Sequence, residues 1–382
     1  MAMPRSKYVR EGQEGVYHCF SRCVRRAFLC GFDPLTRRDF SHRKAWILSR
    51  LKHLSAIFAI EVCAYAILHN HYHLILRIRP DLAAGWSDRE VATRWLRLFP
   101  KNHPSGNTPS PPTEDDIAAL VQWPERIAVL RKRLSSLSWF MGRLNEYIAR
   151  AANKEDDVKG RFWESRFKCQ ALLDAAAIAS CMVYVDLNLI RVGLAATPEE
   201  SDFTSIQERI RSWQKDSILP PSVSGNSGQN IHCESLQEET CIPDKNRELP
   251  DSGFVSVSAK HNSLDASFLP ACWLCPISSE LHLRGILPMT AAEYFDLVDR
   301  SGRMIRSDKR GAIDANLAPI LLRIGANPEA WAETISGFGY KFSLVAGMLS
   351  SLRHLADQFG KRWFKGVAAA RAAFVPKSPQ LA

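Results

Sequence analysis

The segment CAYAILHN (63–70), followed directly by HYHLILRI (71–78), decides the fold that we expect for this chain. Both halves are rich in apolar residues, and the short polar connection between them predicts a hairpin of two strands. Upstream, GVYHCFSRCV (15–24) alternates as a strand does, and residues 39–58 carry apolar side chains at helical spacing. The first part of the chain is therefore expected to run strand, helix, strand, strand.

Further helices and one more strand follow the hairpin. WSDREVATRWLRLF (86–99) predicts a short helix with a Ser or Asp cap, and residues 124–152 are typical of a helix. GRFWESRFKCQAL (160–172) predicts a strand, after which Asp174 caps a helix that runs to about Ile190. The complete order predicts an α+β fold class, in which a ferredoxin-like split βαβ unit forms an antiparallel sheet with helices on one face.

Composition divides the chain into three parts. A length of 382 residues suggests two or three domains. Residues 213–282 are rich in Ser, Asn, Gly, Pro and Glu, which predicts an acidic, low-complexity linker that is flexible and partly disordered. We therefore expect one folded domain over residues 1–212 and a small, basic, mostly helical C-terminal domain over residues 283–382.

The net charge of +10 is distributed unevenly along the chain. Residues 1–213 hold 32 Lys and Arg against 23 Asp and Glu, a balance of +9. Residues 214–282 are acidic, with 4 against 9, and residues 283–382 are basic again, with 14 against 8. Basic surface suggests a polyanionic partner, most often nucleic acid, although charge alone fits a role in solubility equally well.

The apolar runs and the cysteines indicate the cellular compartment in which we expect the protein. No apolar run reaches the length of about 18 residues that a spanning helix needs, so we expect no membrane contact. The N-terminus lacks the apolar core of a secretory signal, and the ten cysteines are scattered, which favours a reducing cytoplasmic setting. Cys272 and Cys275, with Cys233 and Cys241 upstream, form only a weak zinc pattern, and we interpret them as unrelated.

His71 and His73 bracket Tyr72 on the second strand of the predicted hairpin. Side chains at positions i and i+2 of a strand point to the same face, so these two imidazoles can bind one metal ion. The alternative is a pair of surface histidines on a half-exposed sheet. A zinc hydrolase is disfavoured, because neither histidine belongs to an H-E-x-x-H motif.

Tyr184 and Asn188 lie four residues apart on a predicted helix and therefore share a face. Together with the histidine pair, Asn188 would offer a divalent ion two nitrogens and one oxygen, and it would leave positions open for substrate. Tyr184 would then stand beside those positions as a nucleophile; its alternative is simple burial in an apolar helix. Tyr147 is also on a predicted helix, but it has no carboxamide four residues on, so we interpret it as core or DNA-facing.

Three segments carry a resemblance to a known family: LHNHYHLIL (68–76), FWESRF (162–167) and YVDLNLIRVGLA (184–195). The first resembles the HUH motif of single-tyrosine transposases. The other two resemble the strand and the catalytic helix of the REP-associated tyrosine transposase group. The resemblance covers about residues 1–212 and implies a HUH transposase-like catalytic domain with the ferredoxin-like arrangement.

The resemblance also implies roles for individual residues. His71 and His73 would be the metal ligands of the HUH motif, Asn188 the third ligand and Tyr184 the nucleophile, with Mg²⁺ or Mn²⁺ as the ion. The activity implied is cutting and rejoining of single-stranded or hairpin DNA through a 5′-phosphotyrosine intermediate, in DNA transposition. The alternative is a catalytically inactive nucleic-acid-binding regulator on the same fold. The oligomeric state stays open between monomer and homodimer.

Two basic segments are candidates for DNA contact. In residues 160–172, aromatic and basic side chains interleave, a mixture that suits stacking on unpaired bases and contact with phosphates. In residues 294–313, which resemble the tail of longer members of the same group, basic residues gather; a solvated, salt-bridged face is the alternative. The candidate DNA-binding residues are Arg161, Trp163, Arg166, Lys168, Arg303, Arg306, Lys309 and Arg310.

Overall fold

The computed structural model describes residues 5–24, 30–33, 37–100, 110–218, 273–279, 284–305, 321–322 and 324–374. The strands are β1 (Gly15–Arg22), β2 (Phe32–Asp33), β3 (Arg38–Asp39), β4 (Ile60–Ile67), β5 (His71–Ile78), β6 (Lys168–Leu172) and β7 (Val345–Ala346). The helices are α1 (Arg43–Ile57), α2 (Pro80–Gly85), α3 (Asp88–Leu98), α4 (Glu114–Val121), α5 (Pro124–Leu134), α6 (Leu137–Glu155), α7 (Ala175–Asp186), α8 (Asn188–Arg191), α9 (Ser205–Ile218), α10 (Ala291–Ile305), α12 (Trp331–Lys341), α13 (Leu349–Gln358) and α14 (Val367–Ala373). Most of the predicted linker lies outside the described residues.

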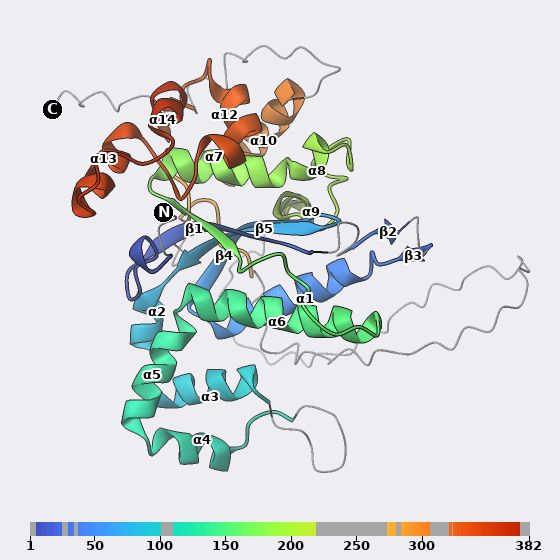
Figure 1. The fold of residues 1–382 in the computed structure, drawn as a ribbon, viewed down its shortest axis with the longest axis vertical. Coiled ribbons are helices and arrows are strands. Elements are labelled where there is room, and N and C mark those ends of the chain that lie inside the picture. The colour runs from blue at the N-terminus through green and yellow to red at the C-terminus, as the bar shows by residue number, and fades with distance from the viewer. Residues whose placement is uncertain are drawn as a thin grey trace, which may run out of the picture.

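A five-stranded sheet forms the centre of the molecule, in the order β4-β5-β1-β6-β7 (Figure 1). β1 pairs in antiparallel fashion with both β5 and β6, and β4 pairs in the same way with β5. β7 then adds to β6 in parallel. The first four of these strands, with α1 and α6 as the crossover helices, follow the split βαβ order, so the predicted α+β fold class is confirmed.

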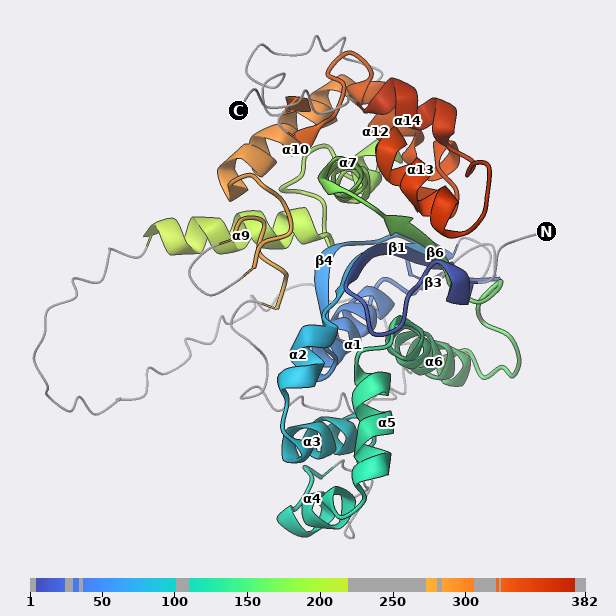
Figure 2. The same ribbon diagram turned by 90° about the vertical axis from the view of Figure 1, so that its left-hand side faces the viewer.

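Helices cover both faces of the sheet (Figures 1 and 2). The crossover helices α1 and α6 lie on one face, where Tyr72 Oη donates a hydrogen bond to Asn145 Oδ1 of α6 at 2.5 Å. α7 lies on the opposite face, and α10 and α12 pack against α7 from the side away from the sheet. The prediction included a helix after Asp174 and a helical C-terminal region, but it placed helices on one face of the sheet only. The structure shows that these helices cover the second face, on the side that carries the candidate site.

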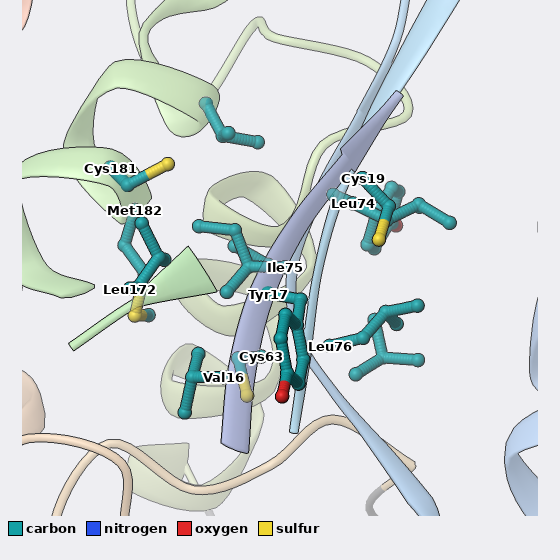
Figure 3. Close-up of a cluster of buried hydrophobic side chains, with 14 of the residues drawn as sticks. Val16, Tyr17, Cys19, Cys63, Leu74, Ile75, Leu76, Leu172, Cys181 and Met182 are labelled. Atoms are coloured by element: carbon teal, nitrogen blue, oxygen red, sulfur yellow. The ribbon is translucent and has the colours of Figure 1, made fainter. Parts of the chain in front are cut away.

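Strand register assigns each side chain to one of the two faces. Antiparallel partners point the same way, so Ile75, which is opposite His18, shares a face with it, whereas Leu74 and Cys19 share the other. Figure 3 shows the result: Met182 of α7 lies on the same side of the sheet as Ile75, while Cys19 and Leu74 pack together on the far side. Both layers are almost completely buried.

The predicted helix over residues 124–152 is wrong at one point, because it is interrupted between α5 and α6. Ser136 has an extended backbone (φ −94°, ψ 121°), and Ser135 Oγ donates back to the Lys132 carbonyl at 3.1 Å. Short hydroxyl side chains that bond to their own backbone compete with helix continuation. The break lets α2–α5 project from the sheet as a helical lobe (Figure 2), of which α2 and α4 were not predicted.

The predicted strand over residues 160–172 is shorter than expected. Only Lys168–Leu172 forms a ladder with β1, while Trp163 makes an isolated bridge to Cys23. Gly160 adopts a left-handed conformation (φ 111°), which turns the chain before the aromatic residues begin. The alternation that suggested a strand instead buries Phe162 and Phe167 without continuous pairing.

The C-terminal region joins one edge of the sheet, and described residues of the predicted linker join the other. β7 pairs with β6, and Met348 N donates to Asp174 Oδ2 at 2.6 Å. At the other edge, Cys275 N donates to the Val62 carbonyl of β4 at 2.8 Å. The division into domains at residues 212 and 282 stays a prediction. Within the described residues, no helix has the length and apolarity needed to cross a membrane.

Candidate active site

The candidate site lies between the sheet and α7. His71 and His73 belong to β5, and register places both on the face that β1 residues His18 and Phe20 share. Gln170 of β6 is the register partner of His18 and extends this face by one strand. A row of polar side chains therefore crosses three neighbouring strands directly below the helix that carries Tyr184.

The structure brings the two predicted histidines and the predicted tyrosine together. The rings of His71 and His73 have centroids 5.0 Å apart and meet edge to face. The Tyr184 ring lies 5.6 Å from the ring of His73, again edge to face. His18, which the sequence did not single out, lies 6.0 Å from Tyr184 and 5.1 Å from His73.

Hydrogen bonds orient both histidine rings. His71 Nδ1 lies 2.5 Å from Asn70 Oδ1, an oxygen that can only accept, so Nδ1 carries the proton and Nε2 keeps its lone pair. His73 Nδ1 lies 2.9 Å from His18 Nε2. When His73 donates in this pair, its Nε2 is free as well. This is the arrangement of imidazoles that bind metal ions, in which one ring nitrogen is held and the other coordinates.

Burial keeps these imidazoles neutral near pH 7. It lowers the pKa of His71 to about 4, with help from the charge of Arg22, and that of His18 to about 4. Burial, the two neighbouring imidazoles and the charge of Arg191 hold the pKa of His73 well below its usual value. Gln170 opposes the effect on His18 in part, although its Oε1 makes no hydrogen bond of standard geometry. Neutral imidazole is the form that binds a metal ion.

The donor set fits a divalent cation in part. His71 and His73 supply two nitrogens on one face, whereas the described residues contain no group of three His, Cys, Asp or Glu side chains that could hold a metal. A third donor would have to be an amide, a water or the substrate. The helix predicted to run to about Ile190 ends at Asp186, and Asn188 is buried at the start of the short helix α8. No described hydrogen bond joins its side chain to either histidine. The residues thus fit an ion that shares its coordination with substrate.

Helix α12 of the C-terminal region packs against Tyr184. Its ring lies 6.1 Å from the ring of Phe338 on α12, and the Arg191 guanidinium carbon lies 4.7 Å from its centroid. A Cβ placed on Gly339 would come within 2.9 Å of the Tyr184 hydroxyl, so the glycine leaves the space that this oxygen needs. The tyrosine is therefore positioned by α12 on one side and by the histidine face on the other.

The helix that carries Tyr184 is fixed at both ends. At its start, Asp174 Oδ1 accepts a hydrogen bond from Ala177 N at 3.0 Å, as the predicted N-cap requires. Near its end, the buried carboxylate of Asp186 accepts from Ser205 Oγ at 2.5 Å and from Tyr294 Oη at 2.5 Å. Burial raises the pKa of Asp186 to about 6, although both hydroxyls act against this rise. These bonds tie α7 to α9 and α10.

A groove with a volume of about 1450 Å³ opens beside the His73–Tyr184 pair. Glu11 is the acidic side chain among its described lining residues, against several cations. Aromatic rings alternate with the cations, and Arg5 lies 3.4 Å over the ring of Phe167. The cations that line the groove are Arg5, Arg10, Arg166, Lys168, Arg191 and Lys365. Such a combination of positive charge and exposed ring faces suits an unpaired nucleic-acid strand.

The predicted DNA-binding residues divide into groups. Arg166 and Lys168 are exposed and line the groove. Trp163 does not: its Nε1 donates to the Asn145 carbonyl at 2.9 Å, so the ring packs inside the domain. Arg161 lies outside the groove lining, and its Nη1 donates to the Glu164 carbonyl.

The basic segment of the C-terminal region is described only at its start. Arg303 is exposed on α10 and forms an ion pair with Asp299 at 2.8 Å, so the structure places it on the salt-bridged face that was the alternative. Arg306, Lys309 and Arg310 lie outside the described residues. The same holds for Cys272, Cys233 and Cys241, while Cys275 is buried and accepts a hydrogen bond from Arg77 at 3.2 Å.

Tyr147 lies far from this cluster in the fold. It belongs to α6, on the opposite face of the sheet, and its ring is 38% exposed with the Arg50 guanidinium 5.0 Å from the centroid. The two residues that sequence reasoning missed are His18 and Arg191. A histidine inside an apolar strand was a signal for His18. Arg191 continues the spacing of Tyr184 and Asn188 by three residues along the same helical face.

No family model and no curated protein matches the chain. Among solved structures, it is similar to the one described as "Structure of the REP associates tyrosine transposase bound to a REP hairpin". The similarity covers 62% of this chain and 100% of that chain, at 12% sequence identity and a TM-score of 0.33. Similarity at this level does not support a conclusion about function, so the proposal below rests on the residues of the site.

Proposed function

We propose that the chain is a transposase-like, metal-dependent DNA endonuclease and strand transferase that uses Tyr184 as its nucleophile. The observation that carries the proposal is that Tyr184 meets His73, whose ring in turn contacts that of His71, beside a basic, aromatic groove. The motif resemblance in the sequence assigns the same residues to the same roles. Single-stranded or hairpin DNA is the substrate class that the groove supports best.

The proposed reaction conserves the energy of the bond that it breaks. The Tyr184 oxygen attacks phosphorus, the bond from phosphorus to the 3′ oxygen breaks, and the phenolic proton is lost while the 3′ oxygen gains one. The product is a 5′-phosphotyrosine and a free 3′-hydroxyl. Attack by a 3′-hydroxyl on the phosphotyrosine then rejoins a strand and releases the tyrosine, so no nucleotide cofactor is needed.

His71 and His73 would hold Mg²⁺ or Mn²⁺ through their Nε2 atoms, with Asn188 as the candidate third ligand. When bound, the ion would polarise the scissile phosphate and neutralise part of its charge. The protein supplies the rest: the Tyr184 ring meets that of His73 edge to face, and α12 packs against its other side, with Gly339 beside the hydroxyl. The buried, uncharged imidazoles avoid repulsion of the cation.

A covalent adduct is the product that tests the proposal. The full chain is incubated with hairpin and single-stranded oligonucleotides that carry a 3′ label, with Mg²⁺ or Mn²⁺, and resolved on a denaturing gel. We expect a labelled protein band that disappears with EDTA and in His71→Ala. Hairpin binding by the wild-type chain without any adduct would instead support the non-catalytic regulator.

A further inference from the structure

Arg191 is a charged residue that lies beside the ring of the proposed nucleophile. Its guanidinium carbon lies 4.7 Å from the centroid of the Tyr184 ring, and its side chain lines the groove together with His73. Arg191 is exposed, whereas His73 beneath it is buried. Because Arg191 and Tyr184 both line the groove, a phosphate that binds beside the tyrosine can reach this guanidinium.

The position of Arg191 is set by the C-terminal region. Arg191 Nη2 donates a hydrogen bond to the carbonyl of Ser336 on α12 at 2.6 Å. Among the described residues, no carboxylate pairs with this guanidinium, in contrast to Arg303, which Asp299 neutralises. An arginine has five N–H donors in a planar fork, so the bond to Ser336 leaves donors for an anion. The charge is held in place but not neutralised.

We propose that Arg191 is a catalytic residue that contacts a non-bridging oxygen of the scissile phosphate, and that α12 holds it there. The assignment rests on the proposed function and deepens it. During phosphoryl transfer, negative charge is spread over the oxygens that do not react, and a fixed cation beside them lowers the barrier. The C-terminal region thereby contributes to the active site through the Ser336 carbonyl and through its contacts with Tyr184.

Arg191→Met tests this assignment, because methionine keeps an apolar side chain over the Tyr184 ring and removes the charge. With saturating DNA, we expect the rate of adduct formation to fall about 100-fold, the loss typical for removal of one transition-state donor. Arg191→Lys should recover part of that loss. Arg126→Met is the matched control, since Arg126 is exposed on α5 and does not line the groove. Wild-type rates in Arg191→Met would overturn the assignment.

Binding provides a second measurement that does not depend on activity. One phosphate contact contributes about 0.7 to the slope of log affinity against log salt concentration for a single strand. Arg191→Met should lower the magnitude of this slope by about that amount, and Arg126→Met should not change it. An unchanged slope overturns the phosphate contact. If the wild-type chain forms no adduct, the proposed function fails, yet the slope still decides whether Arg191 binds phosphate.

Discussion

Tyr184 and Tyr147 differ in what their rings face, although both lie on helices next to the sheet. Tyr184 meets His73 edge to face in the groove, while Tyr147 lies on the opposite side of the sheet beside Arg50. A phenylalanine keeps the ring and its packing but removes the attacking oxygen. Tyr184→Phe should therefore abolish the covalent adduct and still bind DNA, whereas Tyr147→Phe should retain both. Mass spectrometry that located the nucleotide on Tyr147 would refute the site.

Gly339 offers a test of how tightly the nucleophile is held. A Cβ at this position would lie 2.9 Å from the Tyr184 hydroxyl, so Gly339→Ala should displace that oxygen and slow adduct formation at least about 10-fold. Alanine is a better helix former than glycine by about 1 kcal/mol, so the free energy of unfolding should fall little.

Gly142 in α6 provides the matched control for Gly339. It is also a helical glycine, but a Cβ placed there would meet no atom within 4 Å. Gly142→Ala should raise stability slightly, as measured by urea unfolding, and leave cleavage unchanged. Equal cleavage rates in the two variants would show that Gly339 does not position Tyr184.

At the scale of elements, α7 depends on Asp174 for two different bonds. One carboxylate oxygen caps the helix through Ala177 N, and the other accepts from Met348 N of the C-terminal region at 2.6 Å. Asp174→Asn preserves an oxygen for the cap but replaces the second acceptor with an NH₂ group, whereas Asp174→Ala removes both. We expect losses of about 1 kcal/mol and about 2 kcal/mol, respectively, in the free energy of unfolding.

The N-cap of α3 is the control that separates the contribution of the Met348–Asp174 bond from that of a helix cap. Ser87 accepts only from Glu90 N of its own helix, at 3.1 Å. Ser87→Ala should cost about 1 kcal/mol, the usual value for a helix cap. If urea unfolding gave the same loss for Ser87→Ala and Asp174→Ala, the bond to Met348 would contribute nothing.

Elements with strong local signals were predictable from the sequence. The strands around His71 and the caps at Ser87 and Asp174 depend on residues a few positions apart. The face that Tyr184 and Asn188 were expected to share stays a prediction, because α7 ends at Asp186 and Asn188 begins α8. β7 has only two residues, and its place beside β6 is decided by tertiary contacts that no local pattern encodes. The contact of Gly339 with Tyr184 could not be predicted either, because it also depends on tertiary structure. The histidine pair could be found by spacing, but the contact of Tyr184 with α12 could not.

At the scale of the whole molecule, the basic and aromatic groove predicts a preference in DNA form. Ring faces such as Phe20 and Tyr340 can stack only on bases that are not already paired. Affinity should be higher for single strands and hairpins with unpaired flanks than for blunt duplex of equal length. It should fall as salt rises, because cations that line the groove displace counterions. Fluorescence anisotropy with equal affinity for blunt duplex would contradict this expectation.

Buried histidines make the fold sensitive to acid. Burial lowers the pKa of His18 and His53 to about 4, whereas an unfolded chain titrates near 6.5. The unfolded state therefore binds more protons between these values, and stability falls as pH decreases through that window. A fully buried histidine with these pKa values lowers the free energy of unfolding at pH 5 by about 2 kcal/mol relative to high pH. Asp186 acts in the opposite direction, since its raised pKa stabilises the fold as pH falls through about 6.

His53 allows this sensitivity to be measured outside the candidate site. It is only partly buried, on α1, and Arg50 and Arg97 add to the lowering of its pKa. Urea unfolding at pH 7 and at pH 5 measures how much stability is lost on acidification. This loss should be smaller in His53→Gln than in the wild-type chain, by about 1 kcal/mol after allowance for the exposure of His53. A pH dependence identical to that of the wild-type chain would show that folding does not lower the pKa of His53.

The bond from Met348 to Asp174 joins positions that are 174 residues apart in the chain. During synthesis, the histidine strand and the tyrosine helix leave the ribosome long before α12 and β7 exist. A nascent or prematurely terminated chain thus carries Tyr184 without the helix behind it and Arg191 without the Ser336 carbonyl. Contacts over such separations also form slowly. The DNA-cutting centre that we propose is therefore complete only after α12 (Trp331–Lys341) has been synthesised and has folded onto α7.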